Sequence, residues 1–334
     1  MNLSIIIVNY KSAQLIIDCL KTVYAQTNSI RFEVIIVDNF SNDGGRESLA
    51  ASYPDLRWVE MGYNAGFARA NNEGIRNAKG DCILLLNPDT LIESAGIEKC
   101  WRFFRQSPYV ACGVQLINPD RTPQISGSYF VKGALNNLLP LPYMGNWLRS
   151  MGSVMKAKIP HLPDSNTVEE VDWINGAFLM VKVEAIQKAG MMDEDFFLYA
   201  EESEWCYRLG KHGKLCIAGS IKVIHLQGET ANRIFGSEGK GYYNLSDRKG
   251  LQVMVSNHLR IRKQYGRGWF LLHLLFYCLD IPVFFIGFLI NGIFSPSKMR
   301  YSWAQWKGYS RNVISLIALA PRIMRNKPYF YKVL

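Results

Sequence analysis

Cysteine and histidine are scarce in this 334-residue sequence, and neither occurs in a metal-binding pattern. The seven cysteines are an odd number, are scattered along the chain, and include no C-x-x-C pair. Several of them lie inside apolar runs, as reduced core cysteines do, so we expect a reducing, cytoplasmic setting. No basic leader with a cleavage site precedes the first apolar run, and a secretory signal peptide is therefore not expected.

A glycine-rich phosphate-binding loop is also missing. The first predicted strand runs into Asn9-Tyr10-Lys11-Ser12, which is not such a loop, and no P-loop pattern occurs elsewhere. A nucleotidyltransferase would share strand-end carboxylates and a metal ion with the function favoured below. A nucleotidyltransferase should also show a Gly-rich loop with Lys or Arg after the first strand. Because this loop is missing, a nucleotidyltransferase is only the alternative enzyme class.

Acidic residues are nearly absent from the C-terminal part. From Ser256 to Leu334, twelve Lys and Arg residues stand against one acid, Asp280, which gives +11, whereas the whole chain carries +10. The preceding residues therefore carry about −1. With 49% hydrophobic and 20% charged residues, the composition is typical of a globular protein. We expect a near-neutral domain over residues 1–265 and a basic, membrane-associating helical region over 266–334.

An apolar stretch from Trp269 to Phe294 contains no Lys or Arg over 26 residues and is long enough to cross a bilayer. Asp280 and Pro282 near its middle oppose a straight span. Basic residues lie on both sides, and short basic flanks belong on the cytoplasmic side. Two half-helices hinged near Asp280 and Pro282, lying in the interface or dipping in and back, satisfy this rule, whereas a pair of ordinary apolar core helices is the alternative.

The basic and aromatic residues of the tail suit an anionic membrane surface. A nucleic-acid-binding protein is the non-enzymatic alternative. Because the charge is confined to a hydrophobic appendage, we expect a membrane surface as the partner and no nucleic acid.

Strand-like and helix-like segments alternate in the first ninety residues. The predicted strands are Leu3 to Val8, Glu33 to Val37, Arg57 to Met61 and Cys82 to Leu86, and the predicted helices are 15–26, 43–53 and 68–78. Continuous apolar strands favour a parallel sheet covered on both faces. The alternation predicts an α/β fold.

Polar residues follow the predicted strands. These segments are Asn9-Tyr10-Lys11, 38–44, the loop 64–72, and Asn87-Pro88-Asp89-Thr90. Ordinary turn chemistry also favours Asn, Asp and Gly at such places. Because all of them fall on one edge of one sheet, and ligands collect beyond the carboxyl ends of parallel strands, we expect a ligand site there.

Phe196 to Gly213 sets three carboxylates on the first turn of a helix that we expect to end at Gly213. They are Glu201, Glu202 and Glu204. An aromatic-rich run precedes them and is expected to be buried. Glutamates are favourable at any helix N-terminus, so a single one would carry little functional weight.

The motifs IIIVNYKS, VDNFSNDG, NAGFARANN, LLLNPDT, WINGAFLMV, DEDFFLYAEESEWCYRL and VIHLQGET occur in this order. Together they resemble the rhamnosyltransferase-type branch of inverting glycosyltransferase family 2, with the GT-A fold, a Rossmann-like, mostly parallel mixed sheet flanked by helices. The resemblance covers residues 1–265. It implies a nucleotide-binding half over about 1–120, an acceptor and catalytic half over about 121–265, and one-step transfer with inversion.

The resemblance implies Mg²⁺ or Mn²⁺ as cofactor. Asp89 matches the last position of the family's D-x-D motif, and Asn87 stands at the first, so the chain offers one strong carboxylate rather than two. Mg²⁺ commonly uses one or two carboxylates plus substrate phosphates, so one is enough. His225 matches a position near the metal or diphosphate, although a lone His after an apolar strand is more often a satisfied core residue.

The acceptor hydroxyl must lose a proton as it attacks, which requires a positioned general base. By the resemblance Glu202 is the best match, Glu201 is second and Glu204 is structural. Asp193 and Asp195 upstream are expected to cap a loop.

The donor site is expected to be a nucleotide-sugar site. Its candidate residues are Asn9, Tyr10, Asp38, Asn64, Gly66, Arg69 and Asn87. By the resemblance Asp38 accepts a hydrogen bond from the imide of uracil or thymine, which favours a UDP- or dTDP-sugar. Arg69 can bind the diphosphate bidentately, whereas a solvent-facing helix charge is its alternative interpretation.

The acceptor side is expected to include Trp173 to Ala177 and the irregular segment from Ser126 to Val168. The sequence thus predicts an enzyme on the cytoplasmic face of the membrane, peripheral or re-entrant through its C-terminal region. Its expected reaction moves one sugar, with L-rhamnose as a candidate, to a lipid-linked or oligosaccharide acceptor in cell-surface polysaccharide synthesis.

Overall fold

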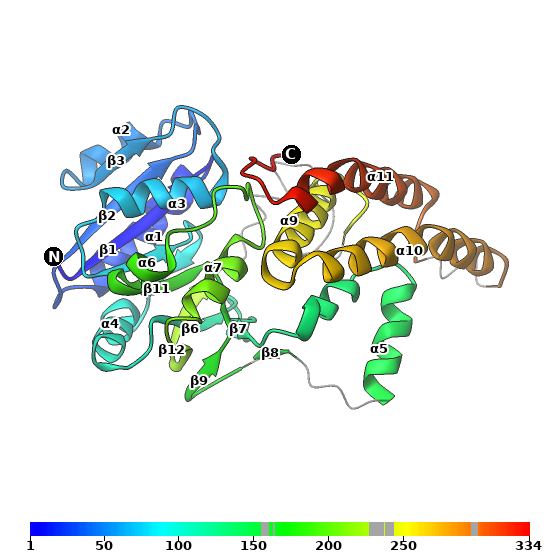
Figure 1. The fold of residues 1–334 in the computed structure, drawn as a ribbon. Helices are drawn as coiled ribbons and strands as arrows, with labels where there is room; N and C mark the ends of the chain where they lie inside the picture. The colour runs from blue at the N-terminus through cyan, green and yellow to red at the C-terminus, as the bar shows by residue number, and fades with distance from the viewer. Residues whose placement is uncertain (155–159, 163, 227–236, 238–243, 295–299) are drawn as a thin grey trace. The chain divides into compact units, whose positions relative to one another are not determined.

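The computed structural model describes residues 1–154, 160–162, 164–226, 237, 244–294 and 300–334 (Figure 1). The chain divides into two compact units. The sheet unit comprises Met1–Phe130, His161–Phe197 and Glu201–Thr230. The helical unit comprises Val131–Pro160, Leu198–Ala200 and Ala231–Leu334.

The sheet unit alternates strands and helices. Its strands are β1 (Leu3–Asn9), β2 (Phe32–Asp38), β3 (Arg57–Glu60), β4 (Cys82–Leu86), β5 (Thr90–Leu91), β6 (Ala111–Ile117), β7 (Gly127–Ser128), β8 (His161–Leu162), β9 (Val168–Val171), β10 (Trp173–Ile174), β11 (Phe178–Lys182) and β12 (Leu215–His225). Its helices are α1 (Ala13–Gln26), α2 (Gly45–Ser52), α3 (Gly66–Asn77), α4 (Gly96–Gln106), α6 (Val183–Ala189) and α7 (Glu201–Leu209).

The main sheet has the strand order β3-β2-β1-β4-β11-β6-β12-β5, and β9 pairs with β12. The pairs from β3 to β4 are parallel, whereas β11 runs antiparallel to both β4 and β6. A second small sheet has the order β10-β7-β8. The predicted α/β fold, with helices flanking a mixed sheet, is confirmed.

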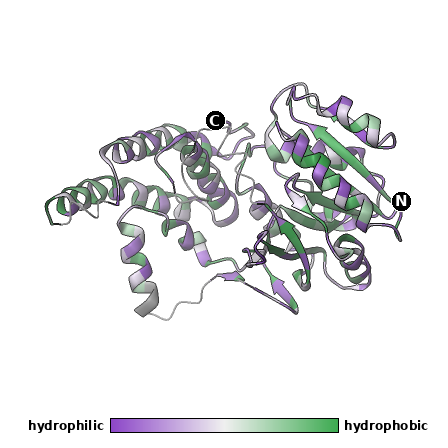
Figure 2. Ribbon diagram, turned by 180° about the vertical axis from the view of Figure 1, so that it is seen from behind, coloured by the Kyte–Doolittle hydropathy of each residue, from purple (hydrophilic) through white to green (hydrophobic). Residues whose placement is uncertain are grey.

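Alternation along the central strands divides the core into two layers. Ile5 and Ile7 of β1 join a cluster with buried residues of α1 and α4. Ile6 points to the other face, where α3 packs so closely that a side chain at Gly74 would overlap the Ile6 side chain. Figure 2 shows the strands of this sheet as hydrophobic. The continuous apolar runs in the sequence therefore reflect burial on both faces.

The predicted elements of the first ninety residues occur with ends shifted by at most a few positions. The helix that we expected to reach Gly213 ends earlier, so that boundary was wrong: α7 stops at Leu209. The next residues form tight turns, in which the amides of Lys211 and His212 donate to the carbonyls three positions back. Such bonds satisfy the last carbonyls without continuing the helix.

The helical unit contains η1 (Lys132–Leu138), α5 (Met144–Val154), α9 (Arg248–Tyr265), α10 (Arg267–Phe294) and α11 (Trp303–Arg325). The segment from Ser126 to Val168, which we expected to be irregular, therefore holds two helices as well as the short strands β7 and β8. Residues 155–159 and 163 of that segment lie outside the described residues. Its assignment to the acceptor side remains a prediction.

One continuous helix, α10, runs through Pro282, so the expected pair of hinged half-helices is wrong. Proline cannot donate a backbone hydrogen bond, and nearby carbonyls can take other donors. The Tyr309 hydroxyl donates to the carbonyl of Tyr277, and the Trp306 indole donates to the carbonyl of Ile281. Both donors come from α11, which thereby supports the helix around the proline.

The domain boundary near residue 265 remains a prediction. In the structure α9 packs against both α10 and α11, so residues 248–265 belong to the same compact unit as the basic tail. Leu259 and Ile261 of α9 are buried in this unit. A truncation at residue 266 would therefore uncover apolar surface of α9.

Asp280 is fully buried on the packed face of α10. Neither of its carboxylate oxygens makes a hydrogen bond within the described part of the chain. Burial raises the pKa of Asp280 from 3.8 to about 7, while the nearby Tyr309 hydroxyl and Met144 amide lower it only in part. At neutral pH this carboxyl is therefore a source of pH sensitivity in the helical unit.

We expect Asp280→Asn to remove a pH dependence of stability. Between about pH 4 and pH 7 the folded chain keeps a proton that the unfolded chain releases, so the free energy of unfolding decreases as the pH rises through this window. The loss amounts to at most about 4 kcal/mol. Thermal unfolding of the full chain across this pH range measures it, with the exposed Asp55→Asn as the control. An identical pH profile for Asp280→Asn and the wild type would contradict the assignment.

Candidate active site

The turn after β4 and the end of β12 bring Asp89 and His225 together. β5 pairs with β12, opposing Thr90 to His225, and the amide of Leu226 donates to the carbonyl of Asp89. The His225 Nε2 lies 3.3 Å from the Asp89 Oδ1, and both side chains are nearly buried. Two residues that are 136 positions apart in sequence thus form one polar site, and their role as metal ligands remains a prediction.

Gln124 fixes which nitrogen of His225 faces Asp89. The Gln124 Nε2 donates to the carbonyl of His225 and to Asn118 Oδ1, so its Oε1 must accept, and it lies 2.9 Å from the His225 Nδ1. The Nδ1 therefore carries the proton. In neutral His225 the lone pair of Nε2 then points toward the Asp89 carboxylate, so two acceptors face each other and a cation is favourable at this place.

A divalent cation fits this donor set. Two ligands at about 2.1 Å from one ion and at right angles lie about 3.0 Å apart, close to the spacing of the Asp89 and His225 atoms. The Gln124 bond to the outer nitrogen is the usual support of a metal-binding imidazole. No cluster of three or more His, Cys, Asp or Glu side chains occurs among the described residues, so a bound ion would also need water or substrate oxygens as ligands.

Asn9 is fully buried at the end of β1 and orients Asp38. Its Nδ2 donates to the Asp38 Oδ1 at 2.8 Å, and the amide of Ser41 donates to the Asp38 Oδ2. The side chain of Asn9 thus helps to hold the Asp38 carboxylate in place. Tyr10 next to it is half-buried, and Lys11 follows with a positive φ of 54°. Direct donor contact by Asn9, Tyr10 or Asp38 remains a prediction.

Asn64 and Gly66 shape the loop that enters α3. The Asn64 Oδ1 accepts bonds from the Asn39 side chain and from the Gly66 amide. Gly66 has a φ of +76°, and a Cβ there would lie 2.2 Å from the carbonyl oxygen of Phe197. The Phe67 amide donates to that same oxygen. Glycine is therefore required for the close approach of this loop to the chain before α7.

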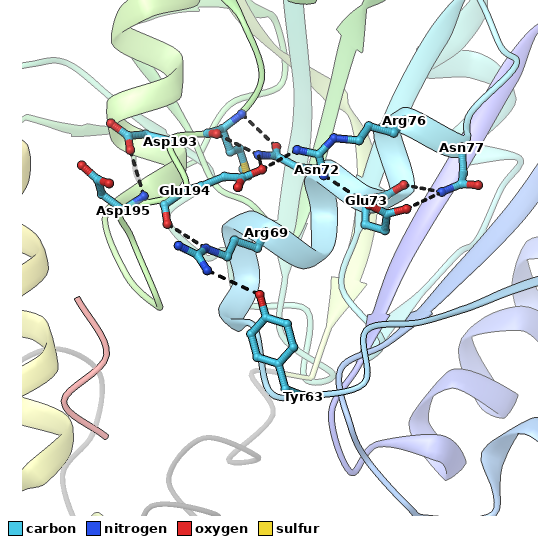
Figure 3. A network of polar contacts seen from close by, with 10 residues as sticks. Tyr63, Arg69, Asn72, Glu73, Arg76, Asn77, Asp193, Glu194 and Asp195 are labelled. Atoms are coloured by element: carbon cyan, nitrogen blue, oxygen red, sulfur yellow. Dashed lines mark hydrogen bonds and ion pairs between the residues drawn. The ribbon is translucent and has the colours of Figure 1, made fainter. Parts of the chain in front are cut away.

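Arg69 points from α3 toward Tyr63 and the 193–195 loop (Figure 3). Its Nε donates to the carbonyl of Glu194, and its Nη1 lies 3.4 Å from the Tyr63 hydroxyl. The solvent-facing interpretation is therefore incomplete, because Arg69 also ties two loops together. Its diphosphate contact remains a prediction.

The same loop is held to α3 by a second set of contacts, also seen in Figure 3. Asn72 donates to the carbonyl of Met192 and accepts from its amide, and Arg76 forms an ion pair with Glu194. Asp193 accepts from the amide of Asp195, the capping role that we expected. These bonds fix the chain that leads into α7.

The three glutamates of α7 have different surroundings. Glu204 is buried and accepts two bonds at 2.9 Å from the Nε of Arg208 one turn on, which agrees with the expected structural role. Glu201 is buried as well, whereas Glu202 is half-buried. Of the three, Glu202 is thus the one whose carboxylate is both positioned and accessible.

Glu202 lies beside the predicted acceptor segment. A Cβ built at Gly176 would be 3.7 Å from the Glu202 Cγ and 3.8 Å from the Phe67 ring. The next residue, Ala177, accepts a bond from the Asn87 amide. The segment 173–177 therefore connects the turn that carries Asn87 and Asp89 with the helix that carries Glu202.

Two features of the site were not anticipated from sequence. Tyr199 and Ala200 precede α7 with φ values of 73° and 66°, which are uncommon for residues other than glycine and mark stored strain. The role of Gln124 could not be predicted from the sequence, because it contacts His225, which lies 101 positions further along the chain. Residues 227–230, which complete the VIHLQGET motif, lie outside the described part.

Comparison with known proteins adds independent information. Residues 4–153 match glycosyl transferase family 2. The low-salt glycan biosynthesis hexosyltransferase Agl10 of Haloferax volcanii is 28% identical over 287 residues, covering 82% of this chain and 85% of the relative. The dTDP-rhamnosyl transferase RfbF of Shigella flexneri is 27% identical, covering 68% and 72%. The N-acetylglucosaminyl-diphospho-decaprenol L-rhamnosyltransferase of Mycobacterium tuberculosis is 25% identical, covering 60% and 68%.

Two solved structures share the fold. TarS residues 1–349 of S. aureus, in complex with UDP-GlcNAc, superpose with a TM-score of 0.53 at 13% identity, covering 97% of this chain and 83% of that one. GalNAc-T7 with UDP, GalNAc and Mn²⁺ gives 0.50 at 14% identity, covering 81% and 56%. At these identities the likeness concerns the fold alone.

Proposed function

We propose that this chain, a glycosyltransferase with a family 2 domain over residues 4–153, moves a single sugar from a dTDP- or UDP-sugar to a saccharide acceptor. The observation that carries the proposal is the spatial order of three groups. The Asp89–His225 pair, the Gly176 segment and Glu202 follow one another along one edge of the sheet unit. Metal ligands, acceptor space and base are the parts that a metal-assisted inverting displacement needs.

Asp89 and His225 would hold Mg²⁺ or Mn²⁺, which when bound supplies charge stabilisation to the departing diphosphate. Support comes from the donor set described above and from Mn²⁺ in the GalNAc-T7 structure. Looser metal affinity than for two carboxylates is expected, because Asn87 contributes no charge.

The reaction forms one bond and breaks one bond. The acceptor oxygen attacks the anomeric carbon, the bond from that carbon to the diphosphate oxygen breaks, and the acceptor proton passes to the Glu202 carboxylate. Gly176 leaves space beside Glu202 in which a sugar hydroxyl can lie, because it carries no side chain there. Glu201, being buried, is the second candidate for the base.

L-rhamnose is our candidate for the transferred sugar, because two of the relatives are described as rhamnosyltransferases. The mycobacterial relative acts on a diphospho-decaprenol saccharide, which supports a lipid-linked acceptor for this chain. We place the enzyme at the cytoplasmic face of the membrane, in cell-surface polysaccharide synthesis. In the described part of the chain α10 is long and apolar enough to cross a bilayer, a feature that buried helices can share.

The donor assignment can be tested with nucleotide sugars. Thermal stabilisation by dTDP-rhamnose, UDP-glucose, UDP-GlcNAc and GDP-mannose in the presence of Mn²⁺ should single out one uracil or thymine donor, because bound ligand stabilises by mass action. Transfer from that donor to a synthetic prenyl-diphosphate saccharide, followed by mass spectrometry, should give a product one sugar heavier. Stabilisation by GDP-mannose alone would overturn the base assignment.

Asp38→Ala should weaken binding of UDP or dTDP by about 1.5 to 3 kcal/mol, the range for a hydrogen bond to a charged group. Isothermal titration calorimetry measures the change. Asp38→Asn keeps the shape and should lose a similar amount, whereas the exposed Asp18→Ala on α1 serves as the matched control. Wild-type affinity in both Asp38 variants would place this carboxylate outside the nucleotide site.

A further inference from the structure

The helix α10 has its polar and apolar faces reversed with respect to a helix of a soluble protein. Its buried positions include His273, Tyr277 and Asp280. Its exposed positions after the first turn are apolar and recur every three or four residues. They include Leu271, Leu275, Leu279, Val283, Ile286, Ile290 and Ile293, whose exposed fractions run from 37% at Val283 to 73% at Ile293. We call these seven side chains the α10 stripe.

A stripe of this length is more than the scattered apolar residues of an ordinary surface. Figure 2 shows the ribbon of α10 as mainly hydrophobic. The packed face accounts for the polar residues: the His273 Nε2 lies 2.8 Å from the carbonyl of Gly133, and Asn291 donates to the Tyr143 hydroxyl. Among the described residues of the helical unit, packing therefore leaves the stripe largely exposed.

Aromatic and basic side chains of α11 lie against α10 and beside one another. Trp303 of α11 lies 6.0 Å from Phe288 of α10, and Trp303 and Trp306 stack at 4.6 Å. The Lys307 ammonium lies over the Trp303 ring at 5.4 Å. Tryptophan and lysine in this arrangement are typical of the boundary between lipid headgroups and acyl chains.

The charge of this surface has one sign. Between residue 267 and the end of the chain the sequence contains a single acid, Asp280, which is buried. Exposed cations include Arg300, Lys307, Arg311 and Arg322. A second copy of this chain would bring like charges together, which costs energy across an interface. An anionic lipid surface is complementary instead.

A full span is unfavourable for the packed helices. Between Tyr277 and Phe288, α10 packs against the first turns of α11, so this part of α10 would carry the start of α11 into the bilayer core. α11 carries Lys307 and Arg311 near its start and Arg322 and Arg325 near its end. A cation at the bilayer centre costs roughly 2.5 to 3.5 kcal/mol on insertion scales. Burial of one face of α10 leaves all four cations in water.

We propose that the α10 stripe inserts into the headgroup and acyl boundary of an anionic bilayer, so that α10 lies in the interface and does not cross it. The proposal rests on the membrane location proposed above and names the surface that makes the contact. In this arrangement the stripe faces the lipid, and the opposite side of α10 packs against α9 and α11.

Flotation of the full chain with vesicles tests the proposal, without donor or acceptor. We expect the wild type to float with phosphatidylcholine vesicles that contain phosphatidylglycerol, more weakly with pure phosphatidylcholine, and to be released by alkaline carbonate. The double variant Leu275→Glu and Ile286→Glu should lower the vesicle partition coefficient by roughly tenfold or more. The matched control is Val168→Glu, an equally exposed apolar position on β9.

A labelling measurement covers the case in which the double variant does not fold. Leu279→Cys in a Cys278→Ser background can carry an environment-sensitive fluorophore, because the other cysteines are buried. Its emission should shift to the blue with anionic vesicles, whereas a label at Val168→Cys should not respond. The outcomes separate the proposals: no vesicle binding by the wild type overturns both this surface and the membrane location.

Normal flotation of a folded double variant overturns the stripe alone. Resistance of the wild type to alkaline carbonate would mean that α10 spans. A wild-type dimer in solution that the double variant abolishes, with no flotation of either protein, would mean that the stripe binds a second copy. Either result overturns interfacial insertion, and neither affects the assignment as a glycosyltransferase.

Discussion

Replacing Asp89 by alanine is expected to abolish sugar transfer while leaving the sheet unit folded. The side chain lies in the turn after β4 and contacts His225, so it contributes to the site rather than to the apolar core. Without its carboxylate, the Asp89–His225 pair loses its anionic ligand for the divalent cation that offsets the diphosphate charge. Chelation with EDTA should have the same effect on the wild type.

Metal binding gives a readout that does not depend on turnover. Mn²⁺ titrated in the presence of UDP and followed by electron paramagnetic resonance should bind roughly tenfold or more weakly to Asp89→Ala. The matched control is Asp81→Ala, because Asp81 is an exposed acid at the opposite end of the same strand. Full transfer in EDTA, or unchanged Mn²⁺ affinity in Asp89→Ala, would show that positive side chains replace the ion.

The part of the fold that could be predicted from sequence is the part with local signals. β4 occurs at Cys82–Leu86, as its apolar run predicts, and β1 and β2 end within one residue of the predicted strands. Such runs are informative because a strand buried on both faces must be apolar at every position. The end of α7 was predicted wrongly because two glycines follow the helix: the prediction took Gly213 as the stop, whereas α7 ends directly before Gly210.

The candidate site was only partly predictable. Asp38 and Asp89 could be predicted because polar residues directly follow the apolar run of a strand, and Glu202 because it lies in a family motif. The orientation of His225 depends on Gln124, which lies 101 positions away and has no motif of its own. Likewise, the contact of Gly176 with Glu202 depends on the packing of β10 against α7. Long-range contacts of this kind leave no local trace in one sequence.

The apolar stretch around residue 280 shows a different limit. Its length and the positions of Asp280 and Pro282 can be read from the order of residues, but the face of the helix that packs against other helices cannot. Pro282, Asp280 and the basic flanks predicted a hinge, whereas α10 is one continuous helix. The reversed pattern of polar and apolar positions becomes visible only when burial is known.

Replacing Glu202 by glutamine should lower turnover by roughly 10² to 10⁴, the usual scale of general-base catalysis. Glutamine keeps the size of the side chain and its contacts beside Gly176, but cannot accept the acceptor proton. Donor affinity should hardly change, because the residues predicted to contact the nucleotide sugar lie after β1, β2 and β4 and at the start of α3, not on α7. Initial rates at saturating donor and calorimetric donor binding together separate the two effects.

Two neighbours on the same helical turn make this test specific. Ser203→Ala removes a half-exposed hydroxyl next to Glu202 and should leave turnover nearly unchanged. Glu201→Gln changes a buried carboxyl and should affect stability more than the transfer step. Near-normal turnover in Glu202→Gln together with a large loss in a folded Glu201→Gln would assign the base to Glu201. Normal turnover in both variants would remove the general base from α7.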